Sequence, residues 1–214
     1  MLPPATIGPG EFFPVVGVGP HAEPWPDGNQ FDPELLEVGD RRNVLDKYRY
    51  WKVEAIVAEL NTKRHKLQIA IENWQHDLNI GSIVRTANAF NVAGVHIIGK
   101  RDWNKRGAMV TDRYLSVMHH PTVQDFAIWA NSQSIPIIGI DNVPGSQHLE
   151  GAELPEQCVL LFGQEGAGMS AEAIEVCSVL YAIEQYGSTR SMNASAAGAI
   201  AMYHWALQHL PRQK

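Results

Sequence analysis

The sequence contains few cysteines, no long hydrophobic run and no cluster of metal-binding residues. Cys158 and Cys177 are the only cysteines among 214 residues, and neither belongs to a Cys-x-x-Cys pair. A disulfide scaffold and a zinc site are therefore not expected, and the reducing cytoplasm is the expected compartment. The longest apolar runs, such as residues 135–140, are far too short to cross a bilayer. We therefore expect neither a membrane span nor a metal.

An excess of positive charge is lacking as well, since the net charge is −6. The charges are unevenly distributed along the chain, however. Residues 1–40 contain seven acids and no Lys or Arg, whereas residues 41–66 contain eight bases and three acids. Binding of a polyanion depends on the local face of a protein rather than on its total charge, so a nucleic-acid partner stays open.

Composition and periodicity divide the chain into three segments. Residues 1–40 hold eight of the thirteen prolines and are expected to form an extended, acidic N-terminal arm. Residues 41–66 are expected to form a basic helical extension with a helix over 43–61. The basic face of this helix either is solvated or contacts RNA. Residues 67–214 form the main domain.

From Leu67 onward, apolar strands alternate with helices. Strands are predicted over 67–73, 95–99, 135–141, 158–163 and 179–185, and helices over 79–90, 123–132, 170–177 and 193–209. Continuous apolar strands that alternate with helices predict an α/β fold with a parallel sheet and helices on both faces. In such sheets, ligands bind at the carboxyl ends of the strands.

A first polar group follows the first predicted strand. Asp77 or Asn79 can cap the next helix, whose free amides favour an anionic ligand. Arg85 lies beside the apolar stripe of that helix, where it could form a structural ion pair or hold a phosphate in two-point geometry.

A second group is the glycine-rich stretch Leu160–Ser170, which reads LLFGQEGAGMS. Gly163, Gly166 and Gly168 allow a tight turn and close approach of a ligand around Glu165. The spacing is neither that of the dinucleotide fingerprint nor that of a P-loop, which disfavours a Rossmann-like metabolic enzyme. A pocket for an adenosine or a ribose, lined by backbone, is at least as well supported as a phosphate cradle.

A third group, Ser191-Met192-Asn193-Ala194-Ser195, precedes the last helix. It could be a helix cap, a hydrolase nucleophile or a pocket wall. The flanking glycines of a nucleophile elbow are absent, which disfavours hydrolysis. Gly187 would provide the tight turn before this group.

Together, the three groups resemble the SPOUT superfamily, and specifically its SpoU/TrmH branch of RNA ribose 2′-O-methyltransferases. The matching motifs are N-x-G-x-x-x-R-T-A at Asn79–Ala87, F-G-x-E-G-x-G at Phe162–Gly168 and S-[LM]-N-x-S at Ser191–Ser195. The resemblance implies a C-terminal deep trefoil knot, a homodimer, S-adenosylmethionine as the methyl donor and tRNA or rRNA as the substrate. It needs no metal.

The resemblance also assigns roles by position. The cofactor would be bound by Gly163, Ile183, Met192 and Gly187. The catalytic set would be Arg85, Asn79, Glu165, Ser191 and Asn193. Arg85 would hold the RNA phosphate and assist deprotonation of the ribose hydroxyl, although its high pKa makes the first role the better supported one.

One position departs from the family pattern. The last predicted strand ends Ile183-Glu184-Gln185, where the family commonly has Ile-Pro. Glu184 would add a negative charge near the cofactor. The alternative hypothesis is therefore a catalytically weak RNA-binding or assembly protein that keeps the fold. If the chain is a methyltransferase, the helix 43–61 and the segment Lys100–Arg106 would help to bind the RNA, and Trp103 either stacks on a base or belongs to the core or an interface.

Overall fold

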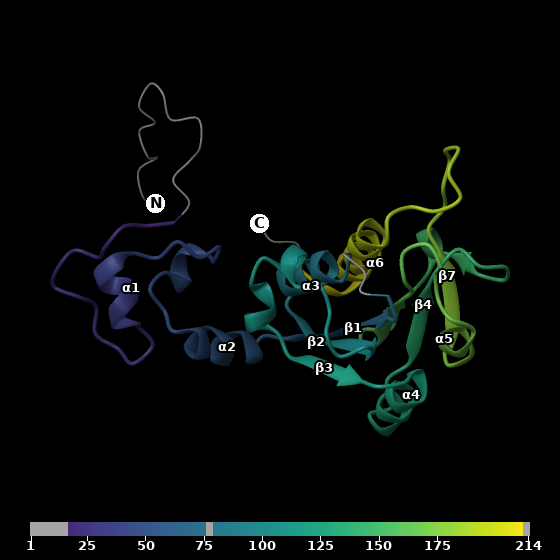
Figure 1. Ribbon diagram of the computed structural model, residues 1–214, viewed down its shortest axis with the longest axis horizontal. Helices are drawn as coiled ribbons and strands as arrows, with labels where there is room; N and C mark the ends of the chain where they lie inside the picture. Colours follow the sequence, from purple (N-terminus) through teal and green to yellow (C-terminus); the bar gives the residue numbers. More distant parts are fainter. Residues whose placement is uncertain (1–16, 76–78, 212–214) are drawn as a thin grey trace. The chain divides into compact units, whose positions relative to one another are not determined.

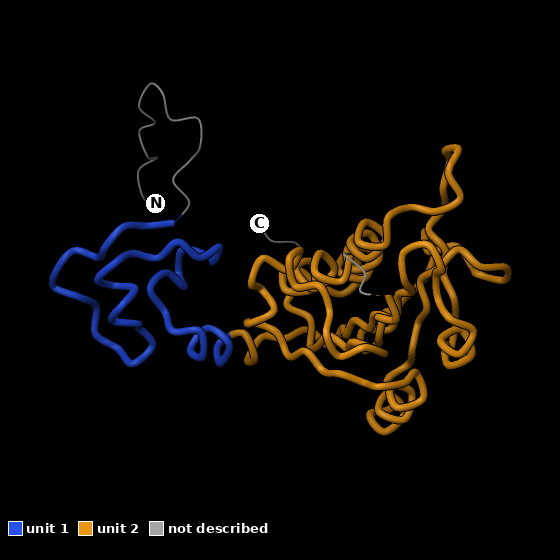
Figure 2. Tube along the Cα trace, in the orientation of Figure 1, with its two compact units in different colours: residues 1–59 blue, residues 60–214 orange. Residues whose placement is uncertain are grey.

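The computed structural model describes residues 17–75 and 79–211. The chain divides into two compact units, residues 1–59 and 60–214 (Figure 2). The helix α2, Val53–Asn61, ends just past the boundary between them.

In the first unit, a short helix and a turn precede α2. These are α1, Pro33–Val38, and the 3-10 turn η1, Asp46–Tyr48. The side chain of Asp32 caps α1 by accepting from the backbone amide of Glu34 at 3.0 Å. This cap, with Pro at the first helical position, explains why a helix begins inside the segment predicted to be extended.

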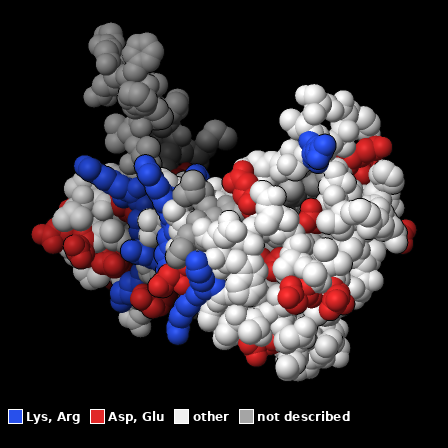
Figure 3. Space-filling view, turned by 45° about the vertical axis from the view of Figure 1, so that its right-hand side comes forward, with Lys and Arg blue, Asp and Glu red and all other residues white. Residues whose placement is uncertain are grey.

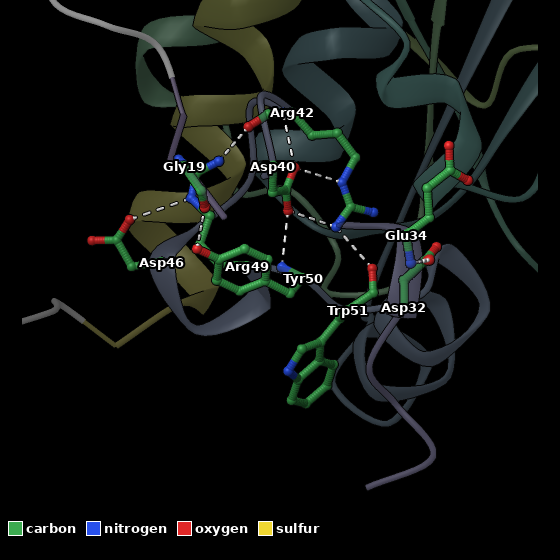
Figure 4. Close-up of polar contacts among 9 residues, drawn as sticks. All are labelled: Gly19, Asp32, Glu34, Asp40, Arg42, Asp46, Arg49, Tyr50 and Trp51. Carbon is green, nitrogen blue, oxygen red and sulfur yellow. Dashed lines mark hydrogen bonds and ion pairs between the residues drawn. The ribbon is translucent and has the colours of Figure 1, made fainter. Parts of the chain in front are cut away.

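The helix predicted over 43–61 is wrong in its first half, because a buried carboxylate holds this stretch in a loop. Asp40 is fully buried and accepts from the backbone amides of Arg42 at 2.9 Å and Tyr50 at 3.0 Å (Figure 4). The guanidinium of Arg42 pairs with the same carboxylate and donates to the carbonyl of Trp51. Tyr50 has a φ of 63°, which ends any helix before α2.

Burial acts to raise the pKa of Asp40, but the hydrogen bonds from Arg42 and Tyr50 outweigh this effect and lower it. The carboxylate therefore stays ionised and keeps its partners near neutral pH.

The second unit is built on a seven-stranded parallel sheet of order β3-β2-β1-β6-β4-β7-β5. The strands are β1, His65–Asn73; β2, Val92–Gly99; β3, Val117–His120; β4, Ile137–Ile140; β5, Gln147–His148; β6, Val159–Phe162; and β7, Val179–Ala182. The four helices are α3, Asn79–Ala89; α4, Val123–Ser132; α5, Ala171–Glu175; and α6, Ala194–His209. Three 3-10 turns, η2 at Arg106–Ala108, η3 at Thr111–Tyr114 and η4 at Leu149–Gly151, lie in the connections.

Helices cover both faces of the sheet, as predicted (Figure 1). Residues of α3 and α6 form one buried cluster with Ile69 and Ile71 of β1, and residues of α4 and α5 form another with Ala70. This alternation follows from the period-2 geometry of a strand, which sends neighbouring side chains to opposite faces. The α/β class and the parallel sheet are therefore confirmed.

The second unit departs from the prediction mainly at its short edge strands. β3 contains two histidines and β5 only two residues, so neither carries a sustained apolar pattern. Along the described ranges, no helix combines the length and apolarity that crossing a membrane requires.

Candidate active site

A cavity of about 410 Å³ opens at the carboxyl ends of β4 and β6, next to the residues that follow β7. Its lining comes from residues 140–143, 162–168 and 191–194, together with Ile183, Gln185 and Ala197. The predicted ligand edge of the sheet therefore carries a cavity, and two of the three sequence motifs line it.

The glycine loop after β6 forms one wall of the cavity. The backbones of Gln164 and Gly168 exchange two hydrogen bonds of 3.0 Å. A Cβ atom added to Gly163 would lie 2.2 Å from the backbone of Gly168 and Met169, so only glycine fits there. Gly166 and Gly168 have φ values of 86° and 70°, which also favour glycine. The glycines therefore set the shape of this wall.

Glu165 links all three motifs through a polar network. Its carboxylate accepts from the side-chain amide of Asn79 at 2.6 Å and from that of Asn193 at 3.4 Å. The Asn193 amide also donates to the side-chain oxygen of Asn79 at 2.8 Å. Residues from three distant parts of the sequence thus fix one another beside the cavity.

Asn193 has a second role as the N-cap of α6. Its side-chain oxygen accepts from the backbone amides of Ser195 at 3.0 Å and Ala196 at 3.3 Å. Both the helix-cap and the pocket-wall interpretation therefore hold for Asn193. The oxygen of its side-chain amide caps α6, and the nitrogen donates within the network.

Three of the predicted site residues lie outside the lining of the cavity. Gly187, Arg85 and Asn79 are not among the residues that line it, although Asn79 bonds to the lining residues Glu165 and Asn193. Arg85 is exposed on α3, and its side chain forms no hydrogen bond or ion pair with the described part of the chain. The structural ion pair considered for Arg85 is therefore not seen there. Asp77, the other candidate cap of α3, lies outside the described residues.

A family model described as the SpoU rRNA Methylase family matches residues 66–203. The chain belongs to this family.

Curated relatives agree with this membership. A tRNA (guanosine(18)-2′-O)-methyltransferase of Borreliella burgdorferi is 26% identical over 175 residues, which are 80% of this chain and 79% of the relative. The Escherichia coli protein of the same name is 25% identical, with 70% of this chain and 67% of the relative covered. A tRNA/rRNA methyltransferase of Synechocystis is 27% identical, but the chain spans only 42% of its length.

Solved SpoU structures share the fold. The A. aeolicus TrmH/SpoU tRNA modifying enzyme superimposes with a TM-score of 0.64 at 21% identity. The alignment covers 73% of this chain and 81% of the chain of that enzyme. A SpoU methyltransferase of Streptomyces viridochromogenes, in complex with AdoMet, gives 0.63 at 23% identity and covers 70% of this chain and 60% of its own.

Glu184, the departure from the SpoU pattern, does not line the cavity, whereas its neighbours Ile183 and Gln185 do. Its carboxylate accepts from the hydroxyl of Tyr186, which raises the pKa of that phenol. Its backbone amide donates to Glu150 at 2.9 Å, a bond that proline could not form. The charge therefore lies beside the cavity wall rather than in it.

Sequence reasoning missed three residues of the SpoU cavity. Asp141 and Asn142 follow β4, and Gln185 follows Ile183. The Asp141 carboxylate accepts from the backbone amides of Met169 at 2.6 Å and Asn142 at 2.7 Å, and so joins the end of β4 to the glycine loop. The sequence signal that could have identified Asp141 is an acid directly after an apolar strand.

The cations of the extension 41–66 are largely engaged within the protein. Lys47 pairs with Glu59 at 3.1 Å, and Lys66 pairs with Glu156 at 3.0 Å. Arg64 donates to the side chain of Asn91 and to the carbonyl of Tyr114. Figure 3 shows Lys and Arg side chains gathered toward the left of the view, with Asp and Glu side chains found across it. Lys47, Lys66 and Arg64 therefore have partners inside the protein, which neither the solvated nor the RNA-contact interpretation had assigned to them.

Trp103 packs partly buried against the core of the second unit, with the ammonium of Lys105 5.4 Å from its ring centre. The core interpretation of Trp103 therefore accounts for its position.

Proposed function

We propose that the chain transfers a methyl group from S-adenosylmethionine to a ribose 2′-hydroxyl of tRNA or rRNA. Membership of the SpoU family and the names of the relatives support this activity. The observation that carries it for this chain is the network of Asn79, Glu165 and Asn193 at the cavity, because it joins the three motifs into one site.

The cavity fits the proposed cofactor. Ile140, Ile183 and Met192 offer apolar contacts for an adenine ring, and exposed backbone of the glycine loop lies beside them. The charged residues of the lining are two acids, Asp141 and Glu165, with no Lys or Arg. This suits a cofactor that carries a positive sulfonium and an ammonium group. When bound, S-adenosylmethionine supplies an electrophilic methyl carbon.

The protein's contribution to the reaction is orientation. A ribose hydroxyl is a poor nucleophile at neutral pH and must lose its proton as it attacks. Asn79, Glu165 and Asn193 hold one another rigidly, so they present fixed hydrogen-bonding groups at the edge of the cavity. Alignment of this kind accounts for a large share of enzymatic rate enhancement. Ser191 lines the same edge and would join them in positioning the ribose.

Arg85 would bind the RNA phosphate. Its guanidinium is exposed and has no partner among the residues that the structure describes, so it can hold a phosphate through two parallel hydrogen bonds. Its position outside the cavity supports this role over that of a general base.

The active form would be a homodimer with a C-terminal trefoil knot. α6 carries a row of exposed apolar side chains, Ile200, Tyr203 and Leu207, at 43%, 57% and 56% exposure. Their spacing places them along one side of the helix, which a second copy would cover.

The arm 1–40 and the extension 41–66 would be appendages of the catalytic domain 67–214, and the reaction would take place in the cytoplasm. The two cysteines, both free, agree with a reducing compartment. The described ranges hold no cluster of His, Cys, Asp or Glu that could bind a metal, and the proposed reaction uses none.

Calorimetric titration of the full chain with S-adenosylmethionine tests the proposal. Saturable binding is expected, and its absence would refute a methyltransferase and leave the RNA-binding alternative. In the same protein, Arg85→Ala should abolish methyl transfer to bulk RNA and leave cofactor affinity nearly unchanged. Transfer by this variant at the wild-type rate would refute the role of Arg85.

A further inference from the structure

Three arginines project from neighbouring elements of the second unit. Arg85 lies on α3, Arg106 on η2 and Arg113 on η3. All three are exposed, and their side chains form no hydrogen bond or ion pair with any residue in the described ranges. They differ in this from the basic residues of 41–66, which mostly have partners inside the protein.

Close backbone packing holds the first two elements together. A Cβ atom on Gly81 of α3 would lie 2.7 Å from the amide nitrogen of Ala108, and one on Gly107 would lie 2.8 Å from that of Ser82. α3 and η2 therefore meet through glycine, without intervening side chains. η3 packs against α3 as well.

The helix geometry places Arg85 next to this contact. Arg85 follows Gly81 by four residues and Ser82 by three, so it lies about one turn further along the same side of α3. Arg106 directly precedes Gly107 at the contact, and Arg113 lies on the other turn packed against the helix. The three exposed arginines therefore lie on elements that pack against one another.

The surrounding charge is also positive. Residues 100–113 contain five of the seventeen Lys and Arg residues of the chain and only two acids. One of these acids, Asp112, is paired with Lys105 at 3.1 Å. The other, Asp102, is exposed in the connection that follows β2. The segment 100–113 is therefore net positive in a chain with a net charge of −6.

We propose that Arg85, Arg106 and Arg113 form a single phosphate-binding surface for the backbone of the substrate RNA. The inference rests on the proposed function and deepens it, since it extends the phosphate contact from one arginine to three. Arginine suits the role because its planar fork matches phosphate oxygens. Such contacts position an RNA without reading its sequence.

Salt-dependent binding to bulk tRNA and rRNA tests the surface. The variants are Arg106→Gln, Arg113→Gln and the double variant, measured by filter binding between 50 and 200 mM KCl. Each substitution should weaken binding and reduce the slope of log affinity against log salt by about 0.7–0.9. Arg106→Lys should keep most of the slope, because the charge is retained. Lys66→Gln, which removes a cation already paired with Glu156, is the matched control and should leave the slope unchanged.

The double variant with a wild-type slope and affinity, and with wild-type S-adenosylmethionine binding to show that it is folded, would overturn the surface. A reduction of the same size in Lys66→Gln would overturn it too. Failure of the proposed function is separate, because it would appear as a wild-type protein that does not bind S-adenosylmethionine.

Discussion

The side-chain amide of Asn193 donates to the side-chain oxygen of Asn79 at 2.8 Å, across 114 residues of sequence. The bond joins the N-terminus of α6 to that of α3, and Glu165 accepts from both residues. Because Asn193 also caps α6, the network and the last helix are coupled. A substitution there can therefore separate stability from activity.

We expect Asn193→Asp and Asn193→Ala to differ in this way. Aspartate keeps the oxygen that caps Ser195 and Ala196, but it replaces the donor with an acceptor that faces Asn79 and Glu165. Asn193→Asp should therefore keep the cap of α6 and lose methyl transfer by about 10²-fold, and it should lose less stability than Asn193→Ala because only repulsion from Glu165 opposes it. Asn193→Ala should lose activity and also about 1 kcal/mol of stability.

Thermal unfolding and initial rates of transfer measure both effects. Asn193→Asp with wild-type activity would show that the donor is unimportant. Equal stabilities of Asn193→Asp and Asn193→Ala would show that the cap of α6 by residue 193 is unimportant for stability.

Gly163→Ala should disrupt the cavity wall. The added Cβ would meet the backbone of Gly168 and Met169 at 2.2 Å, and backbone cannot move aside as a flexible side chain can. We expect a loss of roughly 1–3 kcal/mol of stability and a marked loss of cofactor affinity. Gly187→Ala is the matched control, because nothing lies within 4 Å of its added Cβ. Equal cofactor affinities of the two variants would contradict the account of the wall.

Substitution of Gln185 should change the affinity for S-adenosylmethionine, whereas substitution of Glu184 should not. Gln185 lines the cavity and Glu184 does not. Gln185→Ala should therefore weaken S-adenosylmethionine binding several-fold, while Glu184→Gln leaves it unchanged. Calorimetric titration of both variants makes the comparison. Weaker binding by Glu184→Gln alone would show that the departure from the family pattern affects the cofactor directly.

The central strands β1, β2, β4 and β6 were predictable because they are largely buried and read as apolar runs. The helix α4, Val123–Ser132, was predicted to the residue because Thr122 caps it and its apolar residues have a helical period. The site could be predicted because its three motifs are local. Asn79, Glu165 and Asn193 each carried a signal near a strand end or a helix start.

The features that were not predicted depend on distant contacts. The loop before α2 exists because Asp40 is buried against Arg42 and Tyr50, and nothing local in 43–61 indicates this burial. The role of Asp141 depends on Met169, 28 residues away. The engagement of Lys66 and Arg64 by distant partners likewise could not be read from a run of basic residues.

Acid should destabilise the second unit through a buried histidine pair. His96 and His120 share a hydrogen bond of 2.8 Å between ring nitrogens, and the other ring nitrogen of His96 bonds to the side-chain amide oxygen of Gln68 at 2.8 Å. Burial, and to a lesser extent the neighbouring His120, lowers the pKa of His96 from 6.5 to about 3. Unfolding therefore takes up a proton below pH 6.5, so the stability present above that pH is lost as the pH falls.

The expected loss from His96 is about 2 kcal/mol between pH 6.5 and pH 5, at ~1.4 kcal/mol per pH unit. Urea unfolding at the two pH values measures it. His96→Gln cannot titrate and should be less stable at pH 7 but less sensitive to acid. The same pH dependence in this variant would assign the effect to other groups.

The most direct test of the central claim is the position of the transferred methyl group. Bulk tRNA and rRNA are incubated with the full chain and S-adenosylmethionine labelled in its methyl group and digested to nucleosides. The nucleosides are separated by liquid chromatography and fragmented in a mass spectrometer, which shows whether the label is on the ribose or on the base. We expect the label on the ribose of 2′-O-methylated nucleosides, and about 10²-fold less of it with Asn193→Asp. Label found only on bases, or no label from a protein that binds S-adenosylmethionine, would contradict the proposed reaction.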